Sequence, residues 1–203
     1  MRPLNGLFAV AVAATVALLS ASAALASHAL TPERYTALDA VYTALIPLGK
    51  DRVPASAFRA AQQACNGLDQ ADALLGPLRR KCSTVIGVVR RIETFARCVS
   101  QKGCRRASVR LRRALSRLVG HSRSANRAVD AVVADSACRL ALRTSAHDIR
   151  QIKRIASALR ALERALKTES QADIRRAQRR FDAIDDSALT GRQERDRFRS
   201  SCG

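Results

Sequence analysis

The residues of this sequence that could do chemistry are its cysteines and arginines, and one short stretch holds both. Between Arg97 and Arg113 the chain reads RCVSQKGCRRASVRLRR, so that Cys98 and Cys104 flank a Lys-Gly pair and a run of arginines follows. Two cysteines at this spacing could hold a metal ion, act as a reactive thiol pair, or form a disulfide. Each chemistry makes a different demand on the rest of the sequence.

Zinc is disfavoured because the spacing of its potential ligands is wrong. Cys98, Cys104 and His121 give C-x5-C-x16-H, whereas structural zinc sites separate paired cysteines by about two to four residues. A disulfide tolerates Cα atoms up to about 7 Å apart, and a continuous helix would place these two about 9 Å apart. Gly103 offers a break, because glycine is the usual residue just beyond a helix end. The sequence therefore predicts a Cys98–Cys104 disulfide that fixes two helices as a hairpin.

The N-terminus predicts export. A single arginine precedes an apolar run over residues 7–19, and small residues ending in Ala24-Leu25-Ala26 follow. This is the pattern of a secretory signal peptide over residues 1–26, with Ala21-Ser22-Ala23 as an alternative cleavage signal. The stretch is also just long enough to be an uncleaved membrane anchor, which the small residues near its end disfavour. We therefore expect a secreted or cell-envelope protein.

Export makes disulfides the expected state of the cysteines. All six follow residue 26, and none forms a C-x-x-C pair. The neighbouring arginines would stabilise a reactive thiolate at Cys98 or Cys104, but oxidation removes that thiol. For the remaining cysteines we favour Cys65–Cys82, across a helix connection, and Cys138–Cys202, which closes the C-terminal tail. The first of these pairs requires its helix to end at Asn66-Gly67 rather than to continue to Leu75.

Positive charge is concentrated in the middle of the chain. The protein has 36 Lys and Arg against 17 Asp and Glu, a net charge of +19. Residues 77–128 contain 15 basic residues and 1 acidic residue, whereas residues 27–76 contain 4 basic and 5 acidic residues, and residues 129–203 contain 16 and 11. A uniform bias toward arginine would raise the charge everywhere. The segregation therefore indicates a basic surface formed by residues 77–128.

The segment after Cys104 is predicted to be an amphipathic helix with arginines on its polar side. At 100° per residue, Leu111, Leu115 and Leu118 fall on one face and the arginines fall on the other. The planar guanidinium group can donate two parallel hydrogen bonds to a phosphate. The candidate anion-binding residues are Arg105, Arg106, Arg110, Arg112, Arg113 and Arg117.

An arginine surface of this kind suits an anionic polymer, anionic lipid headgroups or duplex nucleic acid. Aromatic residues make up only 3% of the chain, so the stacking platforms that single-stranded nucleic acids use are scarce. In the alternative interpretation, the protein is a structural or interaction component of the cell envelope that binds another envelope protein, and its arginines form only a solvated face. An anion-binding surface must be continuous, whereas solvated arginines can be scattered or paired.

The chain as a whole predicts an all-α, disulfide-bonded bundle of about six helices. Apolar residues recur at helical spacing, Gly and Pro fall between the periodic segments, and no alternating strand pattern stands out. The bundle is expected over residues 27–190, followed by a tail, residues 191–203, that Cys202 is expected to tie back and that would otherwise be frayed. The expected helices cover about 32–46, 58–66, 78–99, 104–120, 136–167 and 170–190, with a short helix after Ser122.

No enzyme signature is found. The sequence has no G-x-S-x-G, P-loop, H-E-x-x-H or EF-hand pattern, and His28, His121 and His147 have no metal-ligand spacing. Asp182 and Asp186 share a helix face, but arginines one turn away balance them. The sequence therefore favours a non-enzymatic binding module, with no catalytic, cofactor or metal residues and no evident small-molecule site.

Overall fold

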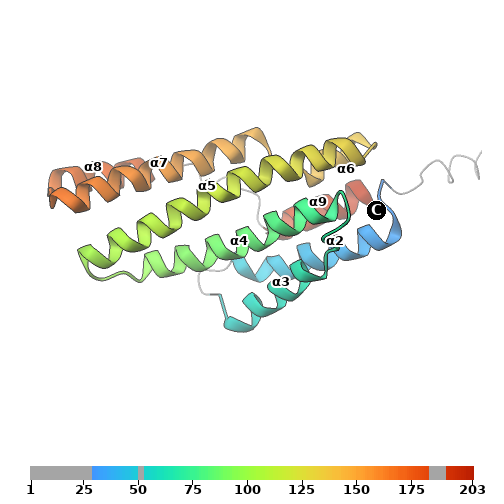
Figure 1. Cartoon of the computed structure of the whole chain (residues 1–203), viewed down its shortest axis with the longest axis horizontal. Coiled ribbons are helices and arrows are strands. Elements are labelled where there is room, and N and C mark those ends of the chain that lie inside the picture. Colours follow the sequence, from blue (N-terminus) through green and yellow to red (C-terminus); the bar gives the residue numbers. More distant parts are fainter. Residues whose placement is uncertain (1–28, 50–52, 183–190) are drawn as a thin grey trace, which may run out of the picture.

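The fold, seen in a computed structural model that describes residues 29–49, 53–182 and 191–203, consists within those ranges of helices joined by short turns, with no strand (Figure 1). This confirms the all-α, disulfide-bonded class. The predicted signal peptide, residues 1–26, lies outside the described residues. Along the chain the elements are α2 (Pro32–Leu45), η1 (Ile46–Gly49), α3 (Ala55–Gly67), α4 (Leu75–Ala96), α5 (Gln101–Val132), α6 (Ser136–Leu142), α7 (Ala146–Thr168), α8 (Gln171–Asp182) and α9 (Gly191–Cys202).

Polar side chains at helix starts set several of these boundaries. Thr31 caps α2 by accepting a hydrogen bond from the Arg34 amide at 3.4 Å, and Pro32 follows as the first helical residue. Ser100 caps α5 in the same way, accepting from the Gly103 amide at 3.1 Å. Such caps satisfy amides that have no partner within the helix. Gly103 therefore lies in the first turn of α5, and the helical break between Cys98 and Cys104 falls at residues 97–100.

One expected helix boundary is wrong because α5 continues through Gly120. The predicted stop at Gly120 and the separate short helix after Ser122 are instead parts of one 32-residue helix. Gly120 lies on the exposed side, whereas Ser122, Ala125 and Val129 continue the buried face. A single glycine costs about 1 kcal/mol of helix propensity, which continued packing of the buried face offsets.

A second expected boundary is wrong in the opposite sense, since the helix predicted over residues 136–167 is divided into α6 and α7. Ser145 and Asp148 form a capping box that starts α7. Asn126 of α5 holds the break, because its side-chain amide donates to the Thr144 carbonyl at 2.8 Å and its carbonyl accepts from the Thr144 amide at 2.9 Å. The break thus depends on a contact with α5, 18 residues earlier in the chain.

The C-terminal tail is tied back by the Cys138–Cys202 disulfide, as predicted, and most of it forms the helix α9. Phe198 has no exposed surface and stacks on Tyr35 and Tyr42 of α2, with ring centroids 5.1 and 4.9 Å apart. Two aromatic stacks and the burial of a phenylalanine supply the energy that orders this segment. Of the helix predicted over residues 170–190, α8 covers Gln171–Asp182, and the remainder lies outside the described residues.

The cysteines form the pairs that the sequence favoured. Cys65–Cys82 joins α3 to α4 with a Cα–Cα distance of 5.8 Å, Cys98–Cys104 closes the α4–α5 turn at 5.1 Å, and Cys138–Cys202 joins α6 to α9 at 4.7 Å. The α3 helix ends at Gly67, as the first pairing required. Disulfides of this kind are typical of an oxidising environment outside the cytosol. Within the described ranges, no helix is long and apolar enough to span a membrane.

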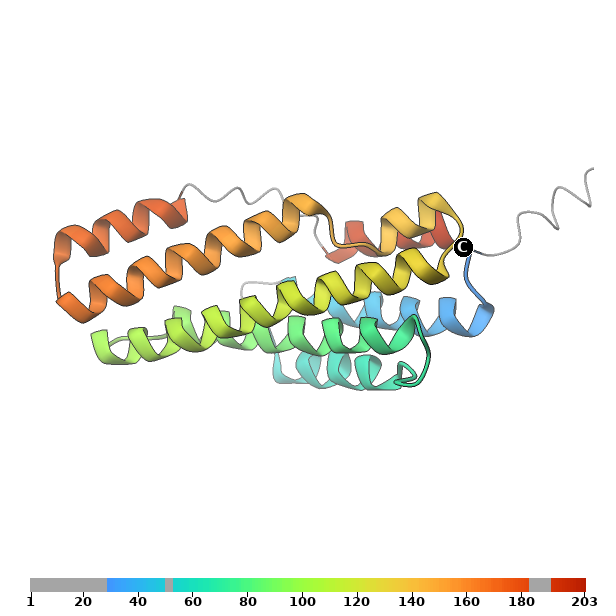
Figure 2. The same ribbon diagram turned by 45° about the horizontal axis from the view of Figure 1, so that its top comes forward.

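Two separate hydrophobic clusters divide the elongated molecule. The larger, here called the disulfide core, lies where α2, α3, α6 and α9 surround the first half of α4 and the end of α5. The smaller, here called the arm core, lies between the second half of α4, the first half of α5, and α7. Figures 1 and 2 show α8 and the α4–α5 turn at one end and α2, α6 and α9 at the other.

The helix predicted over residues 78–99 ends at Ala96, and its apolar residues are only partly buried. Leu78 and Cys82 belong to the disulfide core, but Ile92 is 48% exposed and Val99 is 99% exposed. The reason is that α4 ends at Ala96, so Val99 lies in the turn, and the arm core does not extend over Ile92.

Candidate anion-binding groove

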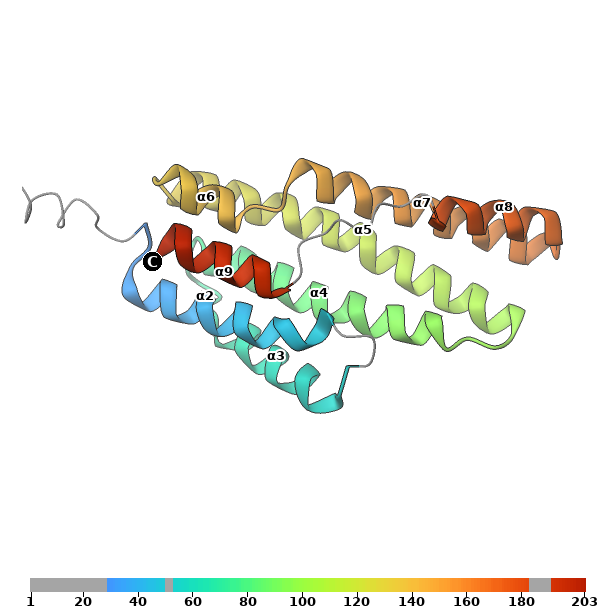
Figure 3. The ribbon, with the colours of Figure 1, turned by 180° about the vertical axis from the view of Figure 1, so that it is seen from behind.

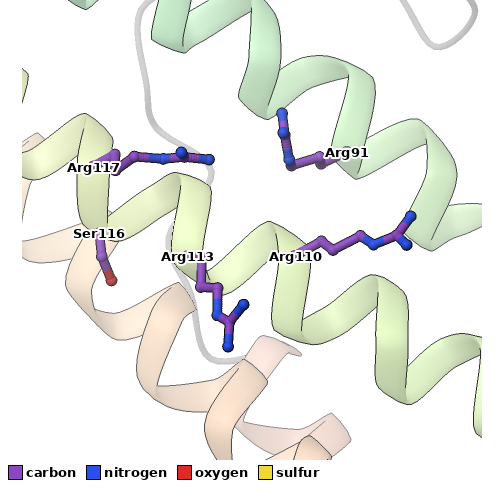
Figure 4. Close-up of a pocket in the computed structure, with 5 residues that line it drawn as sticks. All are labelled: Arg91, Arg110, Arg113, Ser116 and Arg117. Atoms are coloured by element: carbon purple, nitrogen blue, oxygen red, sulfur yellow. The ribbon is translucent and has the colours of Figure 1, made fainter.

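The candidate site is an open groove of about 490 Å³ on the arm. It is lined by four arginines and one serine: Arg91, Arg110, Arg113, Ser116 and Arg117. Arg91 belongs to α4 and the others belong to α5, two helices that pack along each other. In Figure 4, Arg91 and Arg117 extend toward each other from the two helices, while Arg110 and Arg113 extend from neighbouring turns of α5.

The position of the groove arginines follows from the opposite face of α5. Leu111, Leu115 and Leu118 are buried in the arm core, where they meet Val88 of α4 and Leu159 of α7. Because this apolar stripe must face inward, the residues on the polar side of the same turns must face solvent. The Cys98–Cys104 disulfide and the Ser100 cap fix the start of α5 beside the end of α4.

Arg91 was not among the residues predicted from the sequence. Its Nη1 donates to the Gly87 carbonyl at 2.6 Å, which folds the side chain along α4. A Cβ atom at position 87 would come within 3.1 Å of that nitrogen, so the glycine leaves space for the arginine. An arginine four residues after a glycine in a helix is the one sequence signal for this arrangement, and it does not show that the side chain borders α5.

The structure separates the six predicted anion-binding residues into three groups. Arg110, Arg113 and Arg117 line the groove. Arg105 and Arg106 are exposed one turn earlier on α5 and are not part of its lining. Arg112 has an internal partner instead, because its Nε donates to Glu163 of α7 at 2.8 Å and only 22% of its side chain is exposed.

The ion pair of Arg112 is part of the contact between α5 and α7. The hydrogen bond to Glu163 raises the pKa of Arg112. Ser108, which is fully buried, donates to the Leu159 carbonyl at 3.3 Å and lies 3.4 Å from the Glu163 carboxylate. This arrangement satisfies polar groups at a helix interface, and it removes Arg112 from the set of arginines available to a ligand.

The groove arginines have no acidic partner in the part of the chain that the structure describes. Ion pairs are instead formed at other positions, including Arg34–Asp72, Arg143–Asp130 and Arg199–Asp39. Arg90, the neighbour of Arg91, lies over the Phe58 ring, 5.0 Å from its centroid. Cations that are close together and uncompensated repel one another, so a bound anion would relieve that repulsion.

The titratable groups with perturbed pKa values lie elsewhere. Burial lowers the pKa of Lys81 on α4, while the charges of Glu194 and Asp148 act against this lowering. Burial raises the pKa of Glu194 on α9, and Lys81 opposes that shift. Between the described helices no group of three or more His, Cys, Asp or Glu side chains is placed to hold a metal ion. A further hollow of about 270 Å³ between α7 and α8 combines Arg164, Arg176 and Arg180 with Asp173.

Comparison with known proteins adds no functional assignment to this geometry. No family model, no curated protein and no solved structure matches the chain.

Proposed function

We propose that this chain is an exported, non-enzymatic binding module of the cell envelope or the extracellular space. Its function is to bind an anionic partner through the arginine groove between α4 and α5. The observation that carries the proposal is the grouping of Arg91, Arg110, Arg113 and Arg117 around one open groove without an acidic partner among the described residues. A charge that is neither buried nor paired adds little to the stability of the fold, so the grouping of such charges around one groove supports a ligand-binding role.

The chemistry of the groove favours phosphate or a similar oxyanion. Each guanidinium group is always charged and presents a planar fork of donors that matches two oxygens of a phosphate. The Ser116 hydroxyl lies at the same edge, but it donates its proton to the Arg112 carbonyl at 3.1 Å, so the arginines supply the donors. The disulfides are consistent with a site that faces an oxidising compartment.

The test is a binding titration of the purified, oxidised protein over a salt series, with duplex DNA and anionic vesicles as probes. Binding is expected to weaken steeply with salt, because each contact with a phosphate releases a counterion. Replacing the four groove arginines, Arg91, Arg110, Arg113 and Arg117, together by Gln is expected to abolish that salt-dependent binding.

A matched control separates the groove from net charge. Arg150, Lys153, Arg154 and Arg160 are exposed residues of α7, and replacing these four by Gln removes the same charge. The control is expected to retain most of the binding. Equally weak binding by the unmodified protein and by the groove variant would instead support the alternative, a protein-interaction role in which the arginines are only solvated.

A further inference from the structure

The groove is part of a longer row of cations on α5. Lys102, Arg106, Arg110, Arg113 and Arg117 follow one another at steps of four, four, three and four residues, and all five are exposed. At 100° per residue these positions lie within about 80° of one another, and at 1.5 Å per residue they cover about 22 Å. We call this set the cation row. It forms one continuous line along the helix.

The cation row is one helix wide. On its α7 side, level with the groove, the neighbouring positions of α5 are Val109, Ser116 and Arg112, which is paired with Glu163. On its α4 side, Arg91 faces it across the groove. Beyond Arg117 the same face of α5 has two uncharged residues, Gly120 and Ser124, which separate the row from the exposed Arg127.

We infer that the ligand of this groove is a linear polyanion, a single flexible chain with repeated phosphate groups, which lies along α5 from Lys102 to Arg117. This inference rests on the proposed function and specifies the ligand class. A narrow line of regularly spaced cations matches one line of anions. Duplex DNA offers two strands of phosphates, separated by grooves about 6 to 12 Å wide, and would be held better by a broader basic surface.

The composition of the groove excludes other recognition modes. None of its lining residues is aromatic, so the bases of a single-stranded nucleic acid would have no ring to stack on. None is a large apolar residue that could enter a lipid layer. What the groove offers is charge and phosphate-directed hydrogen bonds, which is what a polymer of phosphates without bases requires.

The experiment uses inorganic polyphosphate of defined chain lengths as the probe, with isothermal titration calorimetry on the full oxidised protein. The affinity for each binding site is expected to rise with polymer length until the polymer covers the row of about 22 Å. For longer polymers the affinity per site is expected to stay constant. Five contacts predict that the logarithm of the binding constant falls with the logarithm of salt concentration with a slope of about −3.5.

Single substitutions locate the polymer on the row. Lys102→Gln and Arg113→Gln, at one end and near the middle of the row, are each expected to weaken binding several-fold and to reduce the magnitude of the slope by about 0.7. Arg154→Gln, on the exposed side of α7, removes one charge without touching the row and is expected to leave both quantities unchanged. Far-UV circular dichroism of each variant verifies that it is folded.

The outcomes distinguish this inference from the proposed function. Length-dependent polyphosphate binding that the row variants weaken supports both. Arginine-dependent binding of duplex DNA or vesicles without binding of polyphosphate overturns the inference and leaves the proposed function in place. If none of the three probes binds in a salt-dependent manner, both are wrong. If Lys102→Gln leaves polyphosphate binding unchanged while Arg113→Gln weakens it, the ligand is confined to the groove. That result would contradict a polymer along the row.

Discussion

At the end of the molecule that holds the disulfide core, Arg34 and Arg199 are paired with carboxylates, whereas the arginines in the groove of the arm are not. Arg199 forms two hydrogen bonds with Asp39, at 2.6 and 2.8 Å, and Arg34 donates to Asp72 through two nitrogens. Arg110, Arg113 and Arg117 have no such partner among the described residues. Figure 3 shows the two regions at opposite ends of the long helices α4 and α5.

The two regions also differ in how they are held together. In the disulfide core, Cys138 and Cys202 join segments 64 residues apart, and an aromatic stack joins α9 to α2. In the arm, Cys98 and Cys104 close a turn of only 6 residues, and the packing consists mainly of Leu, Val and Ala. The long-range covalent connection thus lies away from the groove, and repulsion between the groove arginines acts where the disulfide is local.

The largest expected effect of a single substitution lies in the disulfide core. Phe198→Ala is expected to lower the free energy of unfolding by about 4 kcal/mol, because it removes a fully buried ring and both aromatic stacks. Leu159→Ala, at a fully buried position in the arm core, is expected to cost about 3 kcal/mol. Urea titration followed by circular dichroism measures both, and a larger cost for Leu159→Ala would reverse the ranking of the two regions.

The disulfides test the same difference in stability between the disulfide core and the arm. Replacing Cys138 and Cys202 by Ser is expected to cost about 4 kcal/mol, and replacing Cys98 and Cys104 about 2 kcal/mol, because the stabilisation in the chain-entropy treatment grows with the length of the closed loop. The separations are 64 and 6 residues. Thermal and urea unfolding of the two double variants checks this order, and equal losses would show that the arm depends on its disulfide as strongly as the core does.

The ion pair between α5 and α7 is expected to have a smaller effect. Glu163→Gln leaves Arg112 without its carboxylate partner and is expected to cost about 1 kcal/mol, since the pair is only partly buried. Glu169→Gln is a control that removes a nearby exposed carboxylate for which the described structure has no ion pair. The two variants should differ in urea unfolding. Identical curves would mean that the Arg112–Glu163 ion pair does not contribute to the free energy of unfolding.

The Arg199–Asp39 ion pair, at the end that holds the disulfide core, predicts that stability depends on pH. The hydrogen bond from Arg199 lowers the pKa of Asp39, so the folded state keeps this carboxylate ionised at a pH where the unfolded state has begun to bind a proton. The stabilisation is therefore present above the unfolded pKa and is lost as the pH falls through the lowered folded pKa. The stability difference between the unmodified protein and Arg199→Gln should shrink as the pH is reduced from 6 toward about 3. A difference that stays constant over this range would contradict the assignment.

The smallest expected stability effect is at the groove, where the largest loss of binding is expected. Replacing Arg110, Arg113 and Arg117 by Gln should change the free energy of unfolding by no more than about 0.5 kcal/mol in either direction, because these side chains are exposed and have no carboxylate partner among the described residues. Differential scanning calorimetry provides the measurement. A loss of several kcal/mol would show that these arginines belong to the fold and would remove the reason to assign them to a ligand.

The helical class, the presence of disulfides and the polar face of α5 could be predicted from the sequence alone, which favoured the cysteine pairs without deciding them. Helical periodicity and an even number of cysteines are local or compositional signals, and they do not depend on knowing the neighbours of each helix. The row from Arg106 to Arg117 follows from a 100° step alone, so the structure only had to supply the opposite, buried face.

Which arginines remain available to a ligand depends on contacts between helices that are distant in the sequence. Arg112 is lost to Glu163, which is 51 residues away in sequence, and Arg91 enters the groove because α4 packs beside α5. The continuation of α5 through Gly120 and the order of α9 were decided in the same way, by packing that offsets weak helix propensity. The physical reason is that propensity and periodicity act over one or two turns, whereas pairing and burial depend on residues that the fold brings together.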